Sequence, residues 1–75
     1  MVTTSLQLQQ ELETHVNART GRRVRDLAVE LMPERVVLRG LAGTYYVKQL
    51  AQQGIREVLP DVRLENAIVV HRDLV

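Results

Sequence analysis

The segment that most constrains the fold runs from Arg35 to Thr44, because a strand pattern there ends in glycines directly before a helix pattern. Val36 and Leu38 are separated by a single residue, which is the period-two alternation of a half-buried strand. The opposite face of this strand carries Arg35, Val37, Arg39 and Leu41. The segment therefore predicts a strand that leads through a short turn into a helix.

Two glycines, Gly40 and Gly43, bracket the exit of this strand, since glycine adopts backbone conformations that other residues avoid. Thr44 is suited to cap a helix that extends from Tyr45 to about Leu59. The helix has one apolar stripe, made of Val47, Leu50, Ala51, Gly54, Ile55 and Val58. We expect Gly54 to let this stripe approach the sheet or another helix closely.

An earlier helix is predicted by apolar residues at four-residue steps, namely Leu8, Leu12 and Val16. Its N-cap candidates are Thr3, Thr4 and Ser5, whose side-chain oxygens can accept from the free amides of a first turn. Gly21 is suited to end the helix in a left-handed conformation. Glu11 and Glu13 lie outside the apolar stripe, and we interpret both as solvated.

Two further strands complete the pattern. From Arg25 the apolar period changes to two, with Leu27, Val29 and Leu31 on one face and Ala28, Glu30 and Met32 on the other. Pro33 lacks an amide hydrogen, so a turn over residues 32–34 should join this strand to the next as an antiparallel hairpin. A last strand is predicted from Val62 to Val70, with Val62, Leu64, Ile68 and Val70 facing inward.

The order α-β-β-α-β predicts an α+β fold, a two-layer sandwich with both helices on one face of a three-stranded sheet. A strand-helix-strand crossover is nearly always right-handed, so the last strand should run parallel to the second. The other sheet face is unusually apolar for a solvated surface. We expect it to pair with a second copy of the chain through Met32, Val37, Leu41, Ala67 and Val69.

Composition limits the classes of function. The 75 residues make one domain at most, and 10 basic against 9 acidic residues give a net charge of +1, which provides no general attraction to nucleic acid or to an anionic membrane. No cysteine is present, and His15 and His71 are far apart in sequence. We therefore expect no metal site, no cofactor, no catalytic residues and no enzymatic activity. The chain has no secretion signal or membrane-spanning run, which favours a cytoplasmic protein or a piece of a larger one.

A family resemblance follows from three elements. The run Val36-x-Leu38-x-Gly40, a helix with Ala51 on its buried side, and a strand ending Asn66-Ala67-Ile68-Val69-Val70 together resemble the BON domain. The resemblance covers about Leu8 to Val70 and implies the α-β-β-α-β order. It also implies a non-enzymatic interaction module that binds phospholipid surfaces or proteins, often in secreted, periplasmic or membrane-associated bacterial proteins.

Basic residues gather at the connection between the first helix and first strand, with a further arginine across the hairpin. A solvated loop is one interpretation; the other is an anion site for lipid head groups, nucleic acid or an acidic partner, formed by Arg19, Arg22, Arg23, Arg25 and Arg39. The alternative function is a small KH-like nucleic-acid module that uses the Gly40–Gly43 loop and these arginines. Tyr45 and Tyr46 open the second helix, and we expect one to pack on the first helix and the other to be a surface contact.

Overall fold

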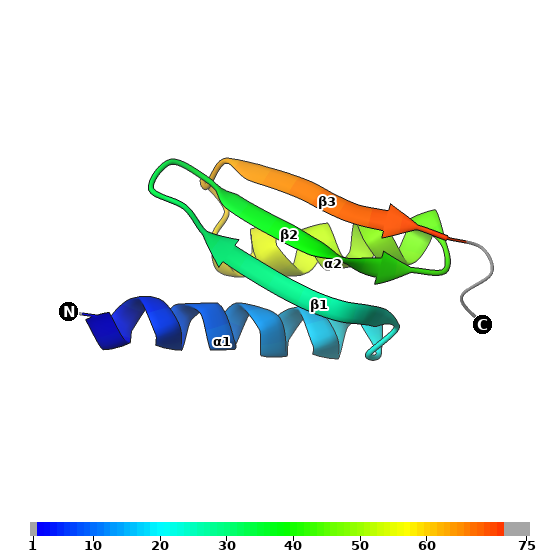
Figure 1. The fold of residues 1–75 in the computed structure, drawn as a ribbon, viewed down its shortest axis with the longest axis horizontal. Helices are drawn as coiled ribbons and strands as arrows, with labels where there is room; N and C mark the ends of the chain where they lie inside the picture. Colours follow the sequence, from blue (N-terminus) through cyan, green and yellow to red (C-terminus); the bar gives the residue numbers. More distant parts are fainter. Residues whose placement is uncertain (1, 72–75) are drawn as a thin grey trace.

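The computed structural model describes residues 2–71 and places two helices on one side of a three-stranded sheet (Figure 1). The elements follow the order α1 (Val2–Thr20), β1 (Val24–Leu31), β2 (Val36–Ala42), α2 (Tyr45–Val58) and β3 (Leu64–Val70). The strand order is β1-β2-β3, with β1 antiparallel and β3 parallel to the central β2. The predicted α+β architecture and the parallel last strand are confirmed.

One hydrophobic core lies between the helices and the inner face of the sheet. It contains Leu12, Val16, Val24, Val29, Val36, Leu38, Ala42, Val47, Ala51, Ile55 and Ile68. Side chains of both helices belong to this cluster, which confirms that both apolar stripes face the same side of the sheet. Gly54 lies against α1, because a Cβ atom there would be 3.3 Å from the Val16 Cγ2 atom. The predicted close approach at Gly54 is therefore made to α1.

Three predicted boundaries are wrong. Because α1 already begins at Val2, residues 3–5 lie within the helix and not before it, and their side chains lie outside the described part of the chain. The strand β3 begins at Leu64, so Val62 precedes it, although Val62 still packs against the core. Gly40 lies inside β2, which continues to Ala42. The turn into α2 therefore begins only at Gly43, and the segment from Gly40 to Gly43 is not a continuous loop.

The position of Gly40 is explained by a β-bulge in β1. The pairing of β1 with β2 shifts between Arg25 and Ala28, so Asp26 and Leu27 both lie opposite Gly40. Asp26 has a φ of 54°, and Gly40 has a φ of 154°. A Cβ atom at position 40 would lie 2.6 Å from the Val24 Cγ1 atom. The bulge therefore requires glycine at this point of β2.

At each outer edge of the sheet, a side-chain oxygen accepts a hydrogen bond from one backbone N–H group. On the β1 edge, the Glu13 Oε2 atom of α1 accepts from the backbone N–H of Val29 at 3.2 Å. On the β3 edge, the Asn66 Oδ1 atom accepts from the backbone N–H of Ile68 at 3.2 Å. The interpretation of Glu13 as merely solvated is wrong, because its carboxylate ties α1 to β1.

Candidate anion-binding site

Three of the five predicted arginines line one pocket at the end of the sheet where β2 leads into α2. The pocket has a volume of about 360 Å³ and is lined by Arg22, Arg23, Arg25, Gly43, Thr44 and Val47. The pocket lies between the α1–β1 connection and the first turn of α2. These two segments are far apart in sequence, and the antiparallel pairing of Val24 with Ala42 brings them together.

The backbone of the turn after α1 determines where Arg22 and Arg23 lie. Gly21 and Arg22 both adopt left-handed conformations, with φ values of 64° and 59°. The N–H of Arg22 donates to the Asn17 carbonyl at 2.9 Å, which is the helix-ending pattern of a Schellman motif. A left-handed conformation at a residue other than glycine costs about 1 kcal/mol or more. The chain therefore holds Arg22 in an unfavourable backbone conformation at the rim of the pocket.

Arg23 is fixed by the last residue of α1. Its Nε–H donates to the Thr20 carbonyl at 2.7 Å. Thr20 is fully buried, and its hydroxyl donates to the Val16 carbonyl at 2.9 Å. Among residues 2–71 the Arg23 guanidinium donates only through Nε, so its two terminal nitrogens are available for a ligand.

The other wall of the pocket is the beginning of α2. Thr44 caps the helix as predicted, since its hydroxyl oxygen accepts from the N–H of Val47 at 3.2 Å. The remaining amides of a first helical turn have no partner within the helix, and they attract negative charge. The pocket thus combines side-chain cations with a positive helix end.

The positive charge of the pocket is not neutralised within residues 2–71. The four ion pairs of this region join His15 and Arg19 to Glu57, Arg35 to Glu65 and Arg39 to Glu30. None of them involves Arg22, Arg23 or Arg25. Asp26, the acidic residue next to Arg25, makes no ion pair there either. An anion is therefore the complementary ligand for this pocket.

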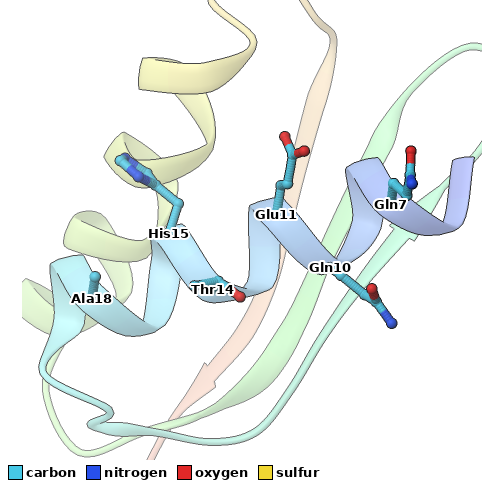
Figure 2. Close-up of a pocket in the computed structure, with 6 residues that line it drawn as sticks. All are labelled: Gln7, Gln10, Glu11, Thr14, His15 and Ala18. Carbon is cyan, nitrogen blue, oxygen red and sulfur yellow. The ribbon is translucent and has the colours of Figure 1, made fainter. Parts of the chain in front are cut away.

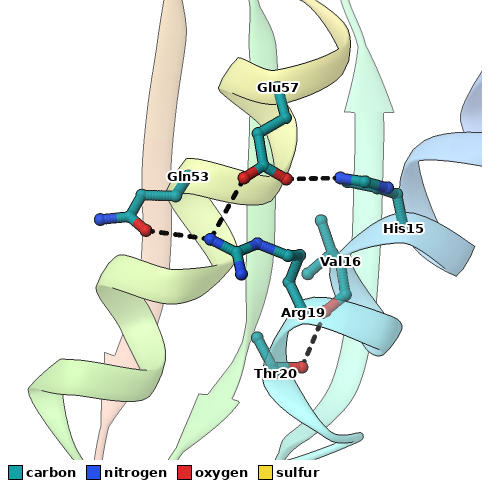
Figure 3. A network of polar contacts seen from close by, with 6 residues as sticks. All are labelled: His15, Val16, Arg19, Thr20, Gln53 and Glu57. Atoms are coloured by element: carbon teal, nitrogen blue, oxygen red, sulfur yellow. Dashed lines mark hydrogen bonds and ion pairs between the residues drawn. The ribbon is translucent and has the colours of Figure 1, made fainter.

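The remaining two predicted arginines lie elsewhere. Arg39 is on the outward sheet face, where its Nε atom is 3.0 Å from Glu30 Oε1. Arg19 faces α2, where one terminal nitrogen is 3.1 Å from Glu57 Oε2 and 3.3 Å from Gln53 Oε1 (Figure 3). Both guanidinium groups have acidic partners, so neither adds to the unpaired charge.

A polar cluster between the helices accounts for His15. The His15 Nε2 atom lies 2.7 Å from Glu57 Oε1, on the opposite side of the carboxylate from Arg19 (Figure 3). The hydrogen bond with His15 and the charge of Arg19 lower the pKa of Glu57 below its ordinary value of 4.5. This cluster is exposed and joins α1 to α2, which is a structural role.

Other surface features provide weaker candidates. A polar hollow along α1 is lined by Gln7, Gln10, Glu11, Thr14, His15 and Ala18 (Figure 2). All six residues belong to α1, so no second element lines the hollow. Residues 2–71 contain no group of three histidines and acidic residues placed to hold a metal ion. Within the same range, neither helix is long and apolar enough to cross a membrane.

The tyrosines are both exposed, at 63% for Tyr45 and 61% for Tyr46. The expectation that one of them packs on α1 is therefore wrong. Tyr45 lines a second, polar pocket beside β3, together with Lys48, Gln49, Gln52, Gln53, Arg56 and Asn66.

The outward sheet face divides the predicted interface residues into two groups. Val37 is only 1% exposed, because its strand neighbours Glu30 and Glu65 flank it and form ion pairs with Arg39 and Arg35. Val69 and Met32, by contrast, are 54% and 43% exposed. Leu41 and Ala67 are half-buried. The available apolar surface is therefore narrower than the sequence predicted.

Sequence reasoning missed that Gly43, Thr44 and Val47 line the arginine pocket. The cap at Thr44 was recognisable, but its proximity to Arg22 depends on the register of β1 against β2. Comparisons with protein-family models, with curated proteins and with solved structures found no match for this chain.

Proposed function

We propose that this chain is a non-enzymatic, BON-like interaction module whose arginine pocket binds the phosphate groups of an anionic phospholipid surface. One observation carries the proposal: Arg22, Arg23 and Arg25 line a pocket at the start of α2 and have no acidic partner within residues 2–71. Guanidinium groups recognise phosphate oxygens through paired N–H donors, and helix N-termini favour the same anions.

Vesicle binding tests this function. Vesicles of phosphatidylcholine alone are compared with vesicles of equal parts phosphatidylcholine and phosphatidylglycerol in a co-sedimentation assay. Basic side chains near an anionic surface contribute about 1 kcal/mol each. The double variant Arg22→Gln/Arg25→Gln should therefore bind the anionic vesicles roughly 30-fold more weakly. Binding of the unchanged protein should also weaken as salt is added.

The matched control removes the same charge elsewhere. Arg35→Gln/Arg63→Gln neutralises two exposed arginines near the start of β3, at the opposite end of the strands. It should retain most of the binding. An equal loss in both double variants would contradict a defined site, and so would equal binding to the neutral vesicles.

Nucleic acid is the alternative ligand for the same arginines. The predicted Gly40–Gly43 loop does not support it, because Gly40 belongs to β2. A salt titration with a generic oligonucleotide separates the two ligands: tight binding with a steep salt dependence favours nucleic acid over phospholipid.

A second candidate function is self-association through the outward sheet face. The favouring observation is that two large apolar side chains, Val69 and Met32, remain exposed on a face that neither helix covers. Sedimentation velocity tests this candidate, and Val69→Lys should shift the distribution toward the monomer. A strict monomer at high concentration for the unchanged protein would contradict it.

A further inference from the structure

The outer edge of β3 presents backbone groups that no strand within residues 2–71 pairs with. The N–H of Val36 donates to the Arg63 carbonyl, and the N–H of His71 donates to the Ala42 carbonyl, both at 2.8 Å. Residues 63 and 71 therefore direct their backbone groups toward β2. Because these directions alternate along a strand, residues 64, 66, 68 and 70 direct theirs outward.

One of these outward N–H groups already donates a hydrogen bond to a side chain of the same strand. The Asn66 Oδ1 atom accepts from the N–H of Ile68, while its Nδ2 atom donates to the Lys48 carbonyl at 3.1 Å and to Gln52 Oε1 at 3.2 Å. The contacts with α2 hold the side chain over the edge. Asn66 thus places an amide oxygen where the carbonyl of an added strand would bind.

We propose that the β3 edge is a pairing surface for the β3 strand of a second copy, and that the Asn66 side chain keeps it closed. In an antiparallel pair centred on Ala67, Asn66 lies opposite Ile68 of the second copy and Leu64 lies opposite Val70. All four of these residues direct their backbone groups outward, so the two edges match. The N–H of Ile68 then donates to the Asn66 carbonyl of the second copy in place of the Asn66 side chain.

The sequence of β3 explains why the occupant is a second copy. The run Ala67-Ile68-Val69-Val70 is uncharged and rich in β-branched residues, which favours strand pairing. In the antiparallel arrangement Glu65 lies opposite Val69, so no like charges face each other. Natural proteins protect such edges with charged side chains, prolines, bulges or covering segments, and we infer that Asn66 protects this edge by occupying the Ile68 N–H.

The test removes the Asn66 side chain from the edge and measures whether the chain associates with itself. Asn66→Ala should add a concentration-dependent dimerisation step in sedimentation velocity, including in a Met32→Lys background, which weakens association through the outward face at a residue outside β3. Amide exchange identifies the surface: in Asn66→Ala, exchange at Ile68 should be fast at low concentration and at least 10-fold slower at high concentration. Face-to-face association would not produce that dependence at residue 68.

Two further variants separate the loss of the capped N–H from the loss of the hydrogen bonds to α2 and locate the paired surface. Asn66→Asp keeps an acceptor for the Ile68 N–H but loses both donated hydrogen bonds, so it should not dimerise. Ala67→Glu added to Asn66→Ala should abolish the dimer, because the two introduced carboxylates face each other at the two-fold axis. The proposal is overturned if Asn66→Ala keeps the sedimentation behaviour of the unchanged chain, or if Asn66→Asp dimerises as Asn66→Ala does.

Discussion

Gly40 is the residue at which the backbone leaves least freedom for substitution. Its φ of 154° is unfavourable for any L side chain, and a Cβ atom there would lie 2.6 Å from Val24 Cγ1 and 3.0 Å from the Arg25 carbonyl oxygen. The Arg25 contact cannot be relieved by a rotamer change, because it involves the backbone. Both the β1 bulge and the position of Arg25 at the arginine pocket therefore depend on this glycine.

We predict that Gly40→Ala lowers the free energy of unfolding by about 3 kcal/mol, from backbone strain and overpacking together. In a domain of this size the loss corresponds to a fall in Tm on the order of 15 °C, measurable by circular dichroism. Gly21→Ala is the comparison: the nearest heavy atom is 3.6 Å away, and only the left-handed conformation is penalised, by about 1 kcal/mol. Similar losses in both variants would argue against the bulge as the cause.

Glu57 is the residue that makes the junction between α1 and α2 sensitive to pH. Its pKa is lowered in the folded protein by the hydrogen bond with His15 and by the charge of Arg19. A carboxyl group with a lowered folded pKa stabilises the fold at pH values above its ordinary pKa of 4.5. That stabilisation is lost as the pH falls through the lowered folded value.

We predict that Glu57→Gln is less stable than the unchanged chain at neutral pH and that the two converge in acid. Urea unfolding monitored at a series of pH values measures the difference. Glu11→Gln, on the exposed hollow of α1, should show no comparable pH-dependent difference. A gap between Glu57→Gln and the unchanged chain that keeps the same size throughout the acidic range would contradict this account.

At the scale of elements, Glu13 connects the helical layer to the edge of the sheet. Its carboxylate accepts from the Val29 N–H, which lies on the side of β1 away from β2. We predict that Glu13→Ala costs roughly 1.5 kcal/mol, the value typical of a hydrogen bond to a charged group, and speeds amide exchange at Val29. Glu11→Ala removes an exposed carboxylate of the same helix and should change neither quantity. Unchanged exchange at Val29 in Glu13→Ala would rule out this role.

The sequence predicted the elements whose signals are local. The α2 stripe is periodic over about three turns, and Thr44 begins α2 and Gly21 ends α1 by chemistry that acts within a few residues. The helix between the second and third strands is a crossover connection, and such a connection joins parallel strands, which predicted the direction of β3. These rules use only the order and periodicity of the chain, so they predicted the architecture without knowledge of any contact.

Features that depend on register were not predictable in the same way. The bulge at Asp26 appears only when β1 is aligned with β2, and this alignment places Gly40 inside a strand. The same alignment selects Arg22, Arg23 and Arg25 for the pocket and leaves Arg39 on the outward face. Sequence proximity grouped the five arginines, whereas strand pairing separates them.

At the scale of the whole molecule, the two helices cover one face of the sheet, and the outward face is left open. Val37, on the open face, is nevertheless 1% exposed beneath the ion pairs of its neighbours. A charged substitution there would disrupt the fold and report nothing about association. Val69 at 54% and Met32 at 43% are the positions at which a charge tests the surface alone.

A chain of 75 residues buries only about 60% of its unfolded surface, so coverage of the open face would add appreciably to its stability. Association that involves only the folded state raises Tm with concentration. We predict that the Tm of the unchanged chain rises by several degrees over a 100-fold increase in concentration, whereas that of Val69→Lys stays constant. Differential scanning calorimetry measures both. Arg63→Gln, which removes an exposed charge but leaves Val69 intact, should keep the concentration dependence, because the apolar contact and not the net charge carries the association. A Tm independent of concentration in the unchanged chain would show that the open face remains solvated.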